Sequence, residues 1–187
     1  MNVFQKWWNN AFPHRLHIRT HVPKFLSTCP DPIHGRVLEL GAGHGWTSQT
    51  ILQTFPQVEL IATEVDESAQ EVFQALQETY GKRLSVEQVD IRELPFDRES
   101  FDVIIAINTI GYIPDTDVEG VIREALRVLK QGKLFGISDA AVSTMPSHNR
   151  RMLVEKILLA EGCELEYVRK SRRFSLWARK AGVDTDL

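Results

Sequence analysis

The chain has 187 residues, of which 43% are hydrophobic and 25% are charged, a composition typical of a folded globular domain. Its 22 basic and 25 acidic side chains give a formal net charge of −3, which disfavours a protein that binds nucleic acid over its whole surface. The two cysteines, Cys29 and Cys163, are too few for a disulfide scaffold or a zinc ribbon, and no apolar run approaches the roughly 20 residues of a membrane span.

Residues 1–30 differ from the rest of the chain because they contain no aspartate or glutamate and carry four basic side chains and three histidines. Trp7 and Trp8 would lie on the apolar face of a first helix, and Pro13 and Pro23 would each open a further short helix. We expect residues 1–34 to form a helical segment that could cover a site on the domain that follows. The basic side chains could contact an anionic substrate or a membrane surface, although docking through the two tryptophans explains the segment more simply.

From residue 36 onward, strand-like and helical patterns alternate along the chain. Strands are expected at residues 36–40, 58–64, 84–89, 101–107, 133–138, 163–168 and 174–178. Helices are expected over residues 69–80, 118–129 and 147–161, with Asp66 capping the first and the capping-box spacing of Thr116 and Glu119 opening the second. This alternation predicts an α/β domain over residues 35–180, with a mostly parallel sheet, helices on both faces and a flexible tail at 181–187.

A glycine-rich loop follows the first of these strands, in the segment Gly41-Ala-Gly43-His-Gly45-Trp46. Glycines let the backbone turn sharply and approach a ligand, and the helix that follows offers free N–H groups. Such a loop is also compatible with an ordinary tight turn between a strand and a helix. A dinucleotide fingerprint would have a third glycine at the position of Trp46, whose indole opposes the close approach that a pyrophosphate needs.

Carboxylates follow or end the first three predicted strands. Glu39 precedes the glycine loop, Glu64 ends the second strand and Asp66 comes just after it, and Asp90 follows the third strand. In an open parallel sheet the carboxyl ends of the strands face one crevice, where an acidic residue after the second strand can accept hydrogen bonds from ribose hydroxyls. A negative charge at the loop also favours a cationic ligand over a phosphate. The pattern therefore indicates a nucleoside with a positive centre and no phosphate.

Further segments extend this pattern as far as residue 139. They read Leu94-Pro-Phe96, Phe101-Asp-Val103, Tyr112-Ile-Pro-Asp115 and Glu124-Ala-Leu-Arg-Val-Leu-Lys130. With these segments in this order, the chain resembles the class I S-adenosylmethionine-dependent methyltransferases that have a type-11 methyltransferase domain. This broad group contains the ubiquinone and menaquinone methyltransferases. The resemblance implies a Rossmann-like, doubly wound and mostly parallel seven-stranded sheet, and S-adenosyl-L-methionine as cofactor.

The resemblance also implies which residues hold the cofactor. The spacing of 25 residues between Glu39 and Glu64 fits the family better than the 27 residues to Asp66, so we expect Glu64 to bind the ribose. Asp90 matches the acceptor for the adenine amino group. The expected cofactor-binding positions are Glu39, Gly41, Ala42, Gly43, Glu64, Val65, Asp90, Ile91 and Asn108.

The expected function is methyl transfer to a small molecule, with Tyr112 and His148 near the substrate and no metal. No residue identifies itself as a general base, and the nucleobase amino-methylation motif is absent because Asn108 is followed by Thr-Ile-Gly. The alternatives are an RNA or lipid-head-group methyltransferase that uses the basic N-terminus, a non-catalytic S-adenosylmethionine-binding module, and a nicotinamide-dependent oxidoreductase. We further expect a cytoplasmic protein that is a monomer or a homodimer.

Overall fold

The computed structural model describes residues 20–140, 147–169 and 173–182. Within the predicted N-terminal helical segment it shows a helix over residues 20–26. The expected helices around Trp7, Trp8 and Pro13, and most of the predicted tail, lie outside the described residues. No helix in the described ranges is both long and apolar enough to cross a membrane.

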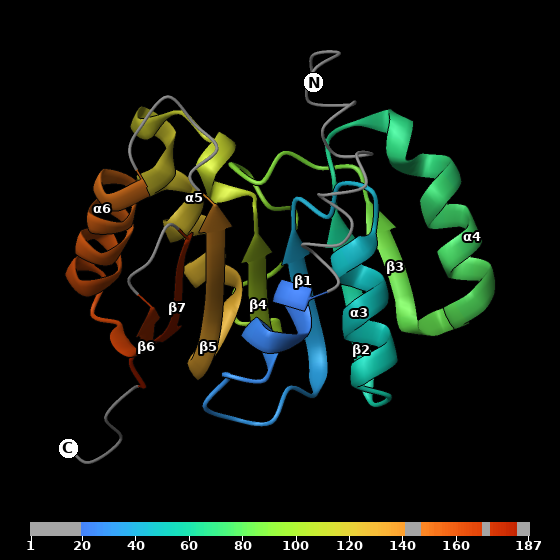
Figure 1. Cartoon of the computed structure of the whole chain (residues 1–187), viewed down its shortest axis with the longest axis horizontal. Coiled ribbons are helices and arrows are strands. Elements are labelled where there is room, and N and C mark those ends of the chain that lie inside the picture. The colour runs from blue at the N-terminus through green and yellow to red at the C-terminus, as the bar shows by residue number, and fades with distance from the viewer. Residues whose placement is uncertain (1–19, 141–146, 170–172, 183–187) are drawn as a thin grey trace.

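A single seven-stranded sheet runs through the molecule in the order β3-β2-β1-β4-β5-β7-β6, and only β7 runs antiparallel to its neighbours (Figure 1). The strands are β1 (Gly35–Leu40), β2 (Val58–Thr63), β3 (Leu84–Glu87), β4 (Phe101–Ile107), β5 (Leu129–Ala140), β6 (Glu164–Arg169) and β7 (Arg173–Arg179). The helices are α3 (Trp46–Thr54), α4 (Gln70–Tyr80), α5 (Asp115–Val128) and α6 (Ser147–Ala160). The predicted Rossmann-like α/β class is confirmed.

Alternating residues of the central strands face two separate cores. On β1, Val37 packs with the helix of residues 20–26, α3 and α4, whereas Leu38 packs with α5 and α6. Both residues are fully buried, as is most of β4, because helices cover the two faces of the parallel sheet. The helices therefore divide into two layers, as Figure 1 shows, and leave the carboxyl ends of the strands as the edge on which loops gather.

The strand order reverses between β1 and β4. From β1 the chain first builds outward to β2 and β3, and then returns to place β4 on the other side of β1. Loops after β1 and β4 consequently diverge at the carboxyl edge of the sheet, and this divergence opens a crevice where ligands of open α/β sheets bind. The glycine loop and Asn108 both lie at this point of the sheet.

Two sequence expectations around α5 are wrong. The helix begins at Asp115 with Pro114 as its N-cap and no side-chain cap, so Thr116 lies inside the first turn instead of capping it. Asp115 and Asp117 in that first turn stabilise the helix through its dipole. The helix ends at Val128, and β5 begins at once at Leu129, four residues before the expected strand. Asp66 does not cap α4, whose N-cap is Ala69 without a side-chain cap. It caps the short 3₁₀ turn Glu67–Ala69 that leads into α4, with Oδ1 accepting from the Ser68 N–H at 2.9 Å.

The helix of residues 20–26 is anchored on β7, the strand nearest the C-terminus. Phe25 stacks on Trp177 with ring centroids 4.8 Å apart, and the Trp177 indole N–H donates to Thr28 Oγ1 at 3.2 Å. His21 Nε2 lies 2.7 Å from Ser138 Oγ on β5. The helix thereby covers β5 and β7 on the face that α3 and α4 cover elsewhere.

Candidate functional site

The glycine loop turns sharply because Gly41, Gly43 and Gly45 all have positive φ, between 54° and 71°. A Cβ on Gly41 would lie 2.6 Å from Thr109 Cγ2, and one on Gly45 would lie 2.6 Å from Leu76 Cδ1, so these two glycines let the loop pack closely on its neighbours. A Cβ on Gly43 would meet no atom within 4 Å. The middle glycine therefore presents bare backbone to open space, where a ligand can approach it.

Glu64 follows β2 and connects that strand end to the glycine loop. Its Oε2 accepts the Gly43 N–H at 2.7 Å, and its Oε1 accepts the N–H groups of Val65 and Asp66 at 2.9 and 3.0 Å. These bonds fix the carboxylate in place while leaving Oε2 with capacity for a further donor. Asp66 serves its own turn as a cap, so Glu64 is the carboxylate that faces the loop.

Glu39 is buried within the same corner of the fold, with 2% of its surface exposed. Its Oε2 accepts from Ser48 Oγ on α3 at 2.5 Å, and burial raises its pKa to about 7, with a further rise from the nearby Glu64 carboxylate. An ordinary glutamate is fully ionised at neutral pH, whereas Glu39 is close to its midpoint there.

Asp90 lies in the loop after β3 and is paired with Arg92. The Arg92 Nη2 atom lies 2.5 Å from Asp90 Oδ2, and this pairing, with the Arg92 backbone N–H, holds the pKa of Asp90 below its usual range. Next to it, Ile91 is buried at 8% exposure in the core that contains α5.

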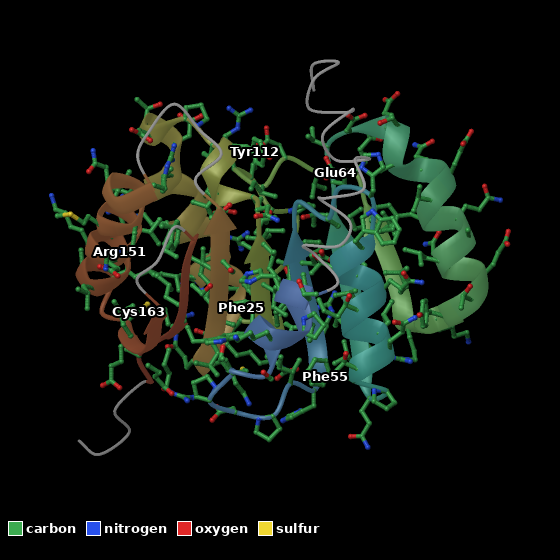
Figure 2. The ribbon with its side chains drawn as sticks, viewed as in Figure 1. Phe25, Phe55, Glu64, Tyr112, Arg151 and Cys163 are labelled. Carbon is green, nitrogen blue, oxygen red and sulfur yellow. The ribbon has the colours of Figure 1, made fainter. Side chains whose placement is uncertain are left out.

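These segments surround one cavity of about 840 Å³. It is lined by Gly41, Ala42, Gly43, Glu64, Val65, Asp90, Ile91, Asn108 and Tyr112 among the expected site residues. Figure 2 shows Glu64 and Tyr112 at the same edge of the molecule, above the carboxyl ends of the strands. The structure thus brings together residues from the loops after β1, β2, β3 and β4.

Two expected site residues are not among those that line the cavity. Glu39 lies beneath the glycine loop with its carboxylate bonded to Ser48. His148 belongs to α6, but its side chain lies outside the described part of the structure. Sequence reasoning also missed lining residues, notably Gln88 and Arg92. Their only sequence signal was closeness to Asp90, which does not tell whether a side chain turns toward a cavity or toward solvent.

One wall of the cavity is formed by Tyr112, Ile113 and Pro114, and a buried arginine holds it. Arg150 of α6 donates from Nη1 to the Ile113 carbonyl at 2.9 Å and pairs through Nη2 with Asp115 Oδ1 at 2.7 Å. Its side chain is 7% exposed. This wall therefore has a defined position even though it is a loop.

A family model described as "Methyltransferase domain" matches residues 37–132, which span β1 to the start of β5. The chain belongs to this family. It is a class I S-adenosylmethionine-dependent methyltransferase domain, and its cofactor is S-adenosylmethionine.

Individual relatives agree with this assignment. The methyltransferase chain is 30% identical over 122 residues to a sterol 24-C-methyltransferase of Aspergillus fumigatus, covering 62% of the chain and 32% of that protein. It is 33% identical over 97 residues to the 2-methyl-6-phytyl-1,4-hydroquinone methyltransferase of Arabidopsis thaliana, covering 52% and 28%. A solved SAM-dependent methyltransferase from Aquifex aeolicus has the same fold, with a TM-score of 0.72, 16% identity and coverage of 97% and 100%. The chain thus spans about a third of the length of the two curated relatives.

The cavity of this methyltransferase fits an adenosine unit in its chemistry. The space at Gly43 admits a ligand atom against backbone, and Glu64 Oε2 can accept one more hydroxyl donor. Trp46 lines the cavity at the position where a dinucleotide-binding loop would have its third glycine. Within the described ranges, no three His, Cys, Asp or Glu side chains are grouped so as to hold a metal ion.

Proposed function

We propose that this methyltransferase transfers a methyl group from S-adenosylmethionine to a small-molecule acceptor. The observation that carries the proposal is that one cavity of about 840 Å³ includes both the glycine-loop side and the wall formed by Tyr112, Ile113 and Pro114. Cavities of roughly 300–1,000 Å³ are typical of small-ligand sites. This volume favours a cofactor and the reactive part of a compact acceptor over a macromolecular substrate.

On the cofactor side, each residue would act through the group that it presents to the cavity. Glu64 would accept a ribose hydroxyl at Oε2, and Asp90 with Ile91 would bind the polar edge and the face of adenine. Asn108 would meet the methionine part through its backbone, which the 2.9 Å bond from its N–H to the Ser138 carbonyl holds in place. The remaining proposed contacts are Gly41, Ala42, Gly43 and Val65.

Glu39 would act from beneath the loop. Its buried carboxylate accepts a hydrogen bond from Ser48, and among the described residues no cationic side chain is paired with it. A cationic amino group at the methionine end of the cofactor would stabilise the ionised form of this carboxylate. We therefore propose that Glu39 contributes charge to the site and does not form part of its lining.

On the acceptor side, we assign the wall formed by Tyr112, Ile113 and Pro114, in which Tyr112 is 41% exposed. The two relatives are named for a sterol and for a phytyl hydroquinone. An acceptor with an apolar body and one nucleophilic atom would fit this wall, with Tyr112 as its contact, and His148 stays a proposal from the sequence alone.

Methyl transfer needs alignment more than it needs a catalytic side chain. The cofactor supplies an activated methyl group on a positively charged sulfur when it is bound. The protein then has to hold the acceptor in line and exclude water, and such positioning can contribute roughly 7–11 kcal/mol to lowering the barrier. His44 and Tyr112 line the cavity and would orient an acceptor hydroxyl.

The test is a transfer assay with cofactor carrying an isotope-labelled methyl group. The purified chain is incubated separately with a sterol, a prenylated hydroquinone, a phenolic polyketide, transfer RNA and phospholipid vesicles. We expect label in at least one of the three small molecules, and loss of that label when S-adenosylhomocysteine is added in excess. Labelling of the RNA or phospholipid instead would favour those alternatives, and cofactor binding without transfer to any acceptor would indicate a non-catalytic module.

A further inference from the structure

Both carboxylate oxygens of Asp90 accept hydrogen bonds from Arg92 in this structure. Oδ1 accepts the Arg92 backbone N–H at 2.9 Å, Oδ2 accepts Nη2 at 2.5 Å, and the Nε–H is shared between the two oxygens at 3.0 Å each. Three N–H groups of one residue therefore occupy most of the roughly four lone-pair positions of the carboxylate. An adenine amino group that approaches Asp90 competes with Arg92 for these positions.

Arg92 also has a second carboxylate within reach. Its Nη1 donates to Asp117 Oδ2 at 3.1 Å, in the first turn of α5. Arg92 lines the cavity, whereas Asp117 is not among the lining residues, and the Arg92 side chain is 57% exposed. Because solvent screens an exposed ion pair, the guanidinium can leave Asp90 at small cost and stay paired with Asp117.

We propose that Arg92 determines specificity at the adenine end of the cofactor cavity, because it competes with the base for Asp90 and supplies hydrogen-bond donors beside it. The inference rests on the proposed role of Asp90 as the acceptor for the adenine amino group. The pair then presents both an acceptor and a donor to the incoming base, and the cofactor binds in competition with an existing ion pair.

This arrangement has a consequence for the base that the site accepts. Adenine presents a 6-amino donor, which suits Asp90, whereas hypoxanthine presents a 6-oxo acceptor, which suits the Arg92 guanidinium. With Arg92 present, a deaminated ligand can still be bound through the arginine. Without Arg92, its 6-oxo group would meet the Asp90 carboxylate with no guanidinium donor beside it, and the site would reject it more strongly.

The experiment measures the dissociation constants of S-adenosylhomocysteine and S-inosylhomocysteine by calorimetry for the wild type, Arg92→Met and Arg98→Met. Arg98 is exposed, lies outside the cavity lining and has the same charge, so its variant is the matched control. We expect Arg92→Met to bind S-adenosylhomocysteine about two- to five-fold more tightly, because the weak ion pair between Arg92 and Asp90 no longer competes with the ligand. We also expect its preference for the adenosyl over the inosyl ligand to rise about ten-fold. Arg98→Met should match the wild type in both.

A second variant tests which carboxylate matters. Arg92 is paired with Asp117 both before and after it releases Asp90, so Asp117→Asn removes a contact common to both states, and we expect it to change S-adenosylhomocysteine binding less than Arg92→Met does. Unchanged or weaker binding in a folded Arg92→Met protein, or an unchanged base preference, would overturn the inference and leave the proposed function standing. A wild type that binds no S-adenosylhomocysteine at all would overturn both. Circular dichroism melting checks that each variant is folded.

Discussion

Glu64 Oε2 lies 2.7 Å from the backbone nitrogen of Gly43, so the carboxylate after β2 accepts a hydrogen bond from the loop after β1. Two neighbouring crossover connections are thereby joined at the carboxyl edge of the sheet. The same carboxylate is fixed on its other oxygen by the N–H groups of Val65 and Asp66. A group held in this way keeps its orientation before any ligand arrives, which reduces the entropy lost on binding.

Replacing Glu64 with alanine should weaken S-adenosylhomocysteine binding by at least about ten-fold, since the variant loses both a ribose acceptor and the bond that positions Gly43. Isothermal titration calorimetry measures this. Glu59 is an exposed residue of β2, the strand that Glu64 follows, so Glu59→Ala is the matched control and should bind like the wild type. If Glu64→Ala keeps full affinity, the ribose assignment is wrong and Asp66 becomes the candidate.

The buried carboxyl of Glu39 should make stability depend on pH. Its pKa is raised from 4.5 to about 7, chiefly by burial, so the folded protein binds a proton there more tightly than the unfolded chain does. The resulting stabilisation is fully present below about pH 4.5 and is lost as the pH rises through about 7, by an amount of about 3 kcal/mol.

Urea unfolding at several pH values between 5 and 8 checks this expectation on wild type and Glu39→Gln. The glutamine keeps the shape and an acceptor for Ser48 but cannot ionise, so its stability should fall less over this range than that of the wild type. Other carboxylates contribute equally to both proteins, and the difference between the two curves isolates Glu39. Parallel curves would show that Glu39 does not titrate in this window.

Two glycine-to-alanine changes should have opposite effects on stability. A Cβ on Gly136 of β5 would lie 2.4 Å from the buried Trp177 ring, so Gly136→Ala should destabilise the protein by about 1–3 kcal/mol. Gly120 lies within α5 with no atom near its missing Cβ, so Gly120→Ala should stabilise it by about 0.5–1 kcal/mol. Thermal unfolding measures both, and a change of the same sign in the two variants would contradict the packing described here.

Asn108 adopts a left-handed backbone conformation, with φ of 54°, where it leaves β4. Asparagine tolerates this region and glycine prefers it, whereas a β-branched side chain is strained there. Asn108→Val should therefore lower the free energy of unfolding by about 1–3 kcal/mol and Asn108→Gly should leave it nearly unchanged. Chemical denaturation distinguishes them. Equal losses in both variants would mean that the side chain, and not the backbone conformation, is what matters.

The alternating pattern of the chain was sufficient to predict the sheet class and most elements. Buried strands such as β1 and β4 are short apolar runs, and the glycine loop lies at the only place where three glycines alternate, so sequence reasoning located both. The start of α5 was missed because Thr116 has the spacing of a capping box, while Pro114 fixes a backbone angle that allows the helix to begin earlier. Local motifs compete in this way, and tertiary context decides between them.

The parts of the site that sequence did not predict depend on contacts between distant residues. Nothing in the order of residues shows that Ser48 would bond Glu39, or that Arg150 would hold the Ile113 carbonyl across 37 positions of chain. Arg92 was missed for a different reason. It is close to Asp90 in sequence, but its role depends on its side chain folding back to donate to the Asp90 carboxylate. Spacing rules report which elements meet, and they do not report which rotamer a long cationic side chain adopts.

The bond between Trp177 and Thr28 joins residues 149 positions apart, so it also sets an order of events during synthesis. Phe25 stacks on Trp177, and this residue becomes available only after β7 has emerged from the ribosome. Until then the helix of residues 20–26 has no surface to dock on, and β5 lacks the strand that covers its edge. A nascent chain that stalls before Trp177 would therefore leave apolar side chains of this helix and of β5 uncovered, and we expect chaperones to recognise this incomplete product.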